Sequence, residues 1–98
     1  KDKAISVKAL CDAKGFELVD TYECKAEKVA RLHSEVSEYY DLVKKGIVEG
    51  RAEELADILF ILLNLVIIEG VDLDAEFSSK LDKNWARPYK YGTAEEGL

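Results

Sequence analysis

An apolar run of fourteen residues, 55–68, constrains the fold of this 98-residue chain more than any other feature. Only Asp57 and Asn64 interrupt it with polar side chains. A membrane-spanning helix needs about 20 apolar residues, so the run predicts a helix of a soluble fold. Because the run is apolar on nearly every side, we expect it to be buried all round, either at the centre of the fold or against a partner chain.

Helix-ending and helix-starting residues divide the rest of the chain. Gly15 and Gly70 are expected C-terminal ends, and Asp72 is an expected N-cap. Asp20 precedes Glu23 by three residues, which predicts a capping box. These signals predict helices at about 3–14, 21–45, 51–69 and 73–86, with 16–19 as a loop that packs inward. We expect an all-α protomer of four helices forming one domain, 1–98.

One face of the second expected helix is marked by apolar residues at three- and four-residue steps. They are Ala26, Val29, Leu32, Val36, Tyr39 and Val43. This spacing predicts that these side chains share a buried face. The tail at 91–98 has little to bury and is expected to be mobile.

Charge and cysteine content limit the possible partners and compartment. The net charge is −6, which disfavours nonspecific binding to nucleic acid. Cys11 and Cys24 do not form a C-x-x-C pair, so we expect reduced cysteines in a cytoplasmic protein. No signal peptide is visible in the sequence, and no membrane association is expected.

Two pairs of acidic residues have the spacing of one helical turn. Glu35 and Glu38 are three apart in the second expected helix, and Glu54 and Asp57 are three apart in the third. The short connection between these helices predicts an antiparallel hairpin in which the pairs face each other. Four carboxylates in apolar surroundings repel one another strongly. A divalent cation with oxygen ligands, Mg²⁺ or Mn²⁺, is the simplest way to compensate them.

Two other readings of the acidic residues remain open. Glu35 can instead form an ordinary surface ion pair with Arg31, four residues earlier. A di-iron carboxylate bundle is disfavoured because it uses Glu-x-x-His motifs, whereas His33 lies two residues before Glu35. We expect His33 to be a partly exposed helix residue.

A group of basic and polar residues follows at the end of the fourth expected helix. Their positions suit hydrogen bonds and ion pairs with phosphate oxygens. The alternative is a helix end at which cations complement the dipole, which accounts for one or two of them. Trp85 is expected to fill the core. The group comprises Lys80, Lys83, Asn84, Arg87 and Tyr89.

These motifs together resemble the all-α nucleotide pyrophosphohydrolases, which include the MazG-like enzymes and the dimeric dUTPases. The order is E-x-x-E, fifteen residues, E-x-x-D, then the basic stretch. The segment "EELADILFILLNL" is similar to the MazG-like metal helix, and "KLDKNWARPYKYG" to the stretch that follows it. The similarity covers about 29–92. The first expected helix shows no recognisable base-reading signature.

The resemblance implies a Mg²⁺-dependent enzyme that hydrolyses nucleoside triphosphates to monophosphate and pyrophosphate in nucleotide-pool house-cleaning. It implies that Glu35, Glu38, Glu54 and Asp57 hold the metal, and that the basic group contacts phosphates. Glu38 is our choice for the general base. The resemblance also implies a dimer or dimer of dimers. The competing hypothesis is a non-catalytic helical module that binds a nucleotide or a protein.

Overall fold

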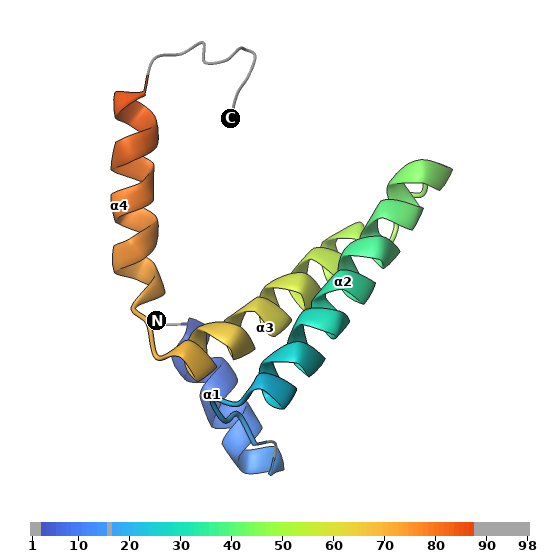
Figure 1. Cartoon of the computed structure of the whole chain (residues 1–98). Coiled ribbons are helices and arrows are strands. Elements are labelled where there is room, and N and C mark those ends of the chain that lie inside the picture. Colours follow the sequence, from blue (N-terminus) through green and yellow to red (C-terminus); the bar gives the residue numbers. More distant parts are fainter. Residues whose placement is uncertain (1–2, 16, 88–98) are drawn as a thin grey trace.

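The computed structural model describes residues 3–15 and 17–87, which form four helices joined by short connections (Figure 1). No strand occurs within these residues, so the all-α expectation is confirmed. The helix bounds agree with those expected from the sequence to within one residue. The tail at 91–98 lies outside the described residues. The helices are α1 (Lys3–Lys14), α2 (Tyr22–Lys45), α3 (Arg51–Glu69) and α4 (Leu73–Ala86).

Side-chain caps explain where α2 and α4 begin. The Thr21 hydroxyl accepts a hydrogen bond from the backbone N–H of Cys24 at 3.1 Å. The expected cap at Asp20 is therefore wrong by one residue, and Asp20 instead forms an ion pair with Lys25 at 2.7 Å. Asp72 caps α4 as expected. Each cap satisfies a backbone donor that would otherwise lack a partner at the helix start.

Helices α2 and α3 form an antiparallel hairpin, side by side along much of their length (Figure 1). Two glycines with positive φ, Gly46 at 70° and Gly50 at 88°, make the tight connection. Only glycine adopts this backbone region without a steric penalty. At the opposite end, the Lys25 ammonium joins Asp20 and the Glu69 carboxylate, the latter at 3.0 Å. The two helices are thus connected by the glycine turn at one end and by ion pairs of Lys25 at the other.

The main core lies where α1 crosses the second half of α3. Val7 and Cys11 from α1 are buried against Leu63 and Val66. The Cys11 thiol also donates a weak hydrogen bond to the Asn64 side-chain oxygen at 3.6 Å. This contact gives the buried polar group in α3 a partner and explains its tolerance in an apolar helix. Partly buried residues complete the cluster, namely Ala4, Leu18, Phe60, Ile67 and Leu73.

Both cysteines are free thiols, as expected. Cys11 is buried, whereas Cys24 is partly exposed on α2. The connection before α2 packs inward only in part, because Leu18 contacts the core while Val19 is exposed.

Burial is uneven along α3. Its buried residues all lie in the second half, and none lies in 51–60. Burial at the centre of the fold is therefore wrong for this helix, because Leu55, Leu59 and Leu62 are substantially exposed. Burial against a partner chain stays a prediction. The buried residues are Ile61, Leu63, Asn64, Val66 and Ile68.

The expected apolar face of α2 also divides into two sets. Leu32 and Tyr39 are partly buried, whereas Val29, Val36 and Val43 are exposed. The exposed valines are seven residues apart and form a second stripe. Apolar residues at three- and four-residue steps form a stripe wide enough to contact two neighbouring helices. Within the described part of one chain, α2 packs along only one such helix, α3.

Helix α4 projects away from the hairpin (Figure 1) and packs on it little beyond Leu73. The expected core role of Trp85 is wrong within one chain, because this side chain is 81% exposed. Phe77 and Leu81 are exposed on the same stripe, at four-residue steps. The radius of gyration is 16.3 Å, against roughly 13 Å for a compact domain of this length. In the described part of the chain, no helix is long and apolar enough to cross a membrane.

Candidate metal centre

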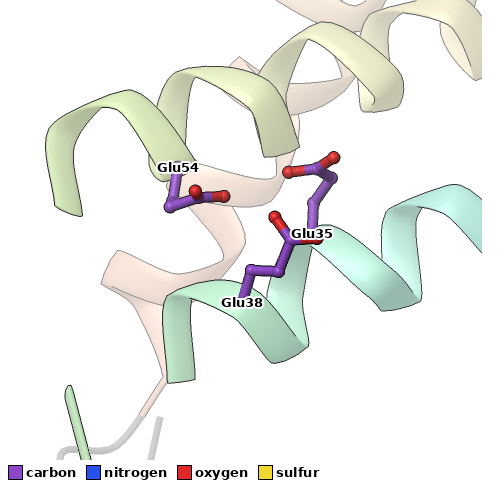
Figure 2. A group of neighbouring side chains, drawn as sticks. All are labelled: Glu35, Glu38 and Glu54. Carbon is purple, nitrogen blue, oxygen red and sulfur yellow. The ribbon is translucent and has the colours of Figure 1, made fainter. Parts of the chain in front are cut away.

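The hairpin brings three glutamates together, and Figure 2 shows their carboxyl groups between the two helices. One carboxylate oxygen from each of Glu35, Glu38 and Glu54 lies within 4.8 Å of the others. Two of these residues come from one turn of α2 and the third from the first turn of α3. Oxygen atoms at this separation can ligate a single divalent cation.

Local sequence explains the placement of each glutamate. Glu35 and Glu38 are three apart, so their side chains leave α2 on nearly the same side. The two-glycine connection allows α3 to start beside them, which places Glu54 opposite. A carboxylate in the first turn of α3 is also stabilised by the positive end of the helix dipole.

Two oxygens in the group lack a hydrogen-bond donor. The Oε1 atoms of Glu35 and Glu54 are buried and have no partner. Glu38, by contrast, is exposed. Buried polar atoms in proteins are almost always satisfied, and a carboxylate without a donor or counter-charge is unfavourable. The two oxygens therefore fit the ligands of a metal ion.

The environment changes the acidity of Glu54. Removal from water, together with the neighbouring carboxyl groups, raises the pKa of Glu54 from its ordinary value of 4.5 to about 7. The Glu35 carboxyl, which can share a proton with Glu54, and the negative charge of Glu38 act in the same direction. Without a cation, this group therefore relieves its repulsion by holding a proton near neutral pH.

Asp57 differs from the other three acidic residues. It lies one turn after Glu54, and its negative charge contributes to the raised Glu54 pKa. Its side chain is exposed, however, and it is not part of the close group. The expectation that Asp57 lies in core surroundings is therefore wrong, because its side of α3 remains open in one chain.

The surface ion pair considered for Glu35 does not form. The Arg31 guanidinium lies 3.7 Å from the Glu27 carboxylate instead. Between residues 3 and 87, leaving out residue 16, no ion pair involves any of the four candidate ligands. His33 is exposed, as expected, and is absent from the close group.

The structure does not bring the basic group to the carboxylates within one chain. Lys80, Lys83, Asn84 and Arg87 are exposed on or just after α4, which projects away from the hairpin (Figure 1). The two lysines border an open hollow of about 380 Å³ together with Phe77. Tyr89 lies outside the described residues.

Fold and site together define an all-α protein with a glutamate group able to hold a metal ion. A comparison with protein families matches residues 24–90 to the MazG nucleotide pyrophosphohydrolase domain. The match covers about two thirds of the chain and includes both acidic pairs and the basic group. The chain belongs to this family, and nucleotide pyrophosphohydrolase is accordingly its class of activity.

Comparisons with curated proteins and with solved structures found no significant match.

Proposed function

We propose that this protein is a Mg²⁺-dependent enzyme that hydrolyses nucleoside or deoxynucleoside triphosphates to the monophosphate and pyrophosphate. The observation that carries the proposal is the group formed by Glu35, Glu38 and Glu54, with two buried oxygens that lack donors. The family match supports the reaction class. The product pair suits a role in removing unwanted nucleotides from the cellular pool, and we place that role in the cytoplasm.

The donor set favours a hard cation. All candidate ligands are carboxylate oxygens, which suit Mg²⁺ and Mn²⁺ better than metals that prefer nitrogen or sulfur. Asp57 extends the set as a fourth ligand, since its exposed carboxylate lies one turn from Glu54. A bound cation would neutralise triphosphate charge and favour ionisation of the attacking water.

Glu38 is the proposed general base. It is the exposed member of the close group, so substrate and water reach it most directly. Its carboxylate would accept the proton of the water that attacks the α-phosphorus. The bond from that phosphorus to the bridging oxygen breaks, and pyrophosphate leaves with the oxygen.

The basic group on α4 would contact the phosphates from a second copy of the chain. Lys80 and Lys83 are exposed and form no ion pair within the described residues. Their cations would balance the charge that develops on the departing pyrophosphate. Asn84, Arg87 and Tyr89 complete the proposed substrate-binding set. Because α4 projects away from its own hairpin, Lys80 and Lys83 are better placed to serve a neighbouring protomer.

A homodimer, or a dimer of dimers, would also cover the exposed apolar stripes. These stripes are Val29, Val36 and Val43 on α2, Leu55, Leu59 and Leu62 on α3, and Phe77, Leu81 and Trp85 on α4. Apolar exposure on this scale is unusual for a monomer and typical of an interface. Sedimentation of the wild type and of Leu59→Asp tests the assembly. We expect a dimer or larger for the wild type and dissociation for the variant, whereas a wild-type monomer at micromolar concentration contradicts the proposal.

The reaction is tested by incubating the protein with a panel of NTPs and dNTPs and Mg²⁺, then identifying the products. Monophosphate with pyrophosphate is expected. Diphosphate with phosphate would indicate a different phosphohydrolase class, and nucleotide binding without turnover would favour a non-catalytic regulatory module. Glu54→Gln should abolish turnover. Glu53→Gln is the matched control, because Glu53 is the adjacent exposed glutamate outside the close group, and it should retain activity.

A further inference from the structure

Arg31 lies one helical turn before Glu35 on α2. Residues four apart on a helix are neighbours, and arginine and glutamate at this spacing commonly pair. Such a pair would place a fixed cation on a carboxylate that the metal centre needs. In the structure Arg31 turns the other way, and its Nη1 atom lies 3.7 Å from Oε2 of Glu27.

Glu27 holds two cations at once. Its Oε1 atom lies 3.1 Å from the Lys28 ammonium, and its Oε2 atom faces Arg31. The Lys28 side chain is only 11% exposed, so one end of this small network is fixed against the packed side of α2. A glutamate that precedes its basic partner by four residues is also the better orientation on a helix. Glu27 therefore competes well with Glu35 for Arg31.

We propose that Glu27 is a positioning residue for the metal centre, which holds Arg31 away from Glu35 and leaves the Glu35 carboxylate available to a divalent cation. This inference rests on the proposed metal site. Glu35 supports it, because its buried Oε1 atom has no partner although a guanidinium is attached one turn away. The sequence spacing indicates Arg31 as a partner of Glu35 and does not single out Glu27.

Removing Glu27 should allow Arg31 to compete with the metal. If the released guanidinium pairs with Glu35 at the strength usual for helix ion pairs, the cation must displace it, and metal affinity should fall about two-fold. Lys28 lies seven residues before Glu35, about 10 Å along the helix axis. It is therefore less able to take the place of Arg31.

The test measures Mn²⁺ affinity by electron paramagnetic resonance of free Mn²⁺, without nucleotide. The variants are Glu27→Gln, Arg31→Gln and the double variant, with circular dichroism to confirm folding. Glu53→Gln reports the loss of one nearby negative charge that has no link to Arg31. We expect Glu27→Gln to bind more weakly than the wild type and than Glu53→Gln. Arg31→Gln should bind at least as tightly as the wild type, and the double variant should match Arg31→Gln.

Three results would overturn the inference. Wild-type affinity in Glu27→Gln would show that Arg31 does not reach Glu35. An equal loss when Glu27→Gln is added to the Arg31→Gln background would show an effect that does not pass through Arg31. Absence of Mn²⁺ binding by the wild type would instead remove the metal centre itself, and the inference with it.

Discussion

Metal binding at the glutamate group should release protons in an amount set by Glu54. A metal ligand must be ionised, whereas removal from water and the neighbouring carboxyl groups raise the pKa of Glu54 to about 7. At that pKa, about nine tenths of the protein holds the proton at pH 6, about half at pH 7 and about one tenth at pH 8. Binding one cation should therefore release about 0.9, 0.5 and 0.1 protons at these pH values.

Isothermal titration calorimetry with Mn²⁺ measures this number directly. At each pH the titration is repeated in buffers of different ionisation enthalpy, and the slope of binding heat against that enthalpy gives the protons released. Because the Glu54 carboxyl interacts with its acidic neighbours, the number of protons released belongs to the whole group. Glu53→Gln should give the same slopes, since Glu53 lies outside the close group.

Binding heat that does not depend on the buffer's ionisation enthalpy at pH 6 and pH 7 would refute the raised pKa of Glu54. Such a result would mean that the metal-free group is already fully ionised, and that neither burial nor mutual repulsion raises its pKa. Proton release that does not fall between pH 6 and pH 8 would also contradict it, because a carboxyl that titrates near 7 loses most of its proton over that range.

Three further predictions concern stability and catalysis. In metal-free protein the proton on Glu54 is bound more tightly by the folded than by the unfolded chain, so the melting temperature should fall as pH rises from 4.5 through 7. Glu54→Gln should flatten this dependence, and an unchanged pH profile would count against the assignment. Glu38→Gln should lower kcat roughly 10²- to 10⁴-fold in steady-state assays, and full activity would exclude Glu38 as the base. Leu63→Ala should lower the free energy of unfolding by roughly 2–5 kcal/mol in urea titrations, because Leu63 is buried in the core.

Local signals in the sequence were sufficient to predict the helices. Glycines after α1, α2 and α3 and the N-cap at Asp72 act through the backbone of a few neighbouring residues, so their effect does not depend on the rest of the fold. The N-cap of α2 was placed at Asp20 instead of Thr21, an error of one residue. It arose because the Thr21 side chain offers an equivalent hydrogen-bond acceptor. The antiparallel hairpin followed from a connection too short for any other arrangement.

The contacts of exposed apolar residues could not be predicted in the same way. Periodicity identifies a stripe but not the partner that covers it. Val36 on α2 and Trp85 on α4 were assigned to a core that one chain does not provide for them. Glu35, Glu38 and Glu54 were predicted together because helical spacing and hairpin geometry are both local. The relation of Lys80 to that group depends on where α4 packs, which the sequence pattern does not encode.

The uneven burial of α3 has a consequence for motion. All its buried residues lie in 61–68, and the half that carries Glu54 and Asp57 has none. Segments with few buried contacts open at a low cost in free energy. In metal-free protein, backbone amides in 51–60 should therefore exchange hydrogen faster than those in 61–68. A cation held between Glu35 and Glu54 would link that end of α3 to α2 and slow the hydrogen exchange there. The bound metal ion would thus stabilise the helix segment that supplies its own ligand.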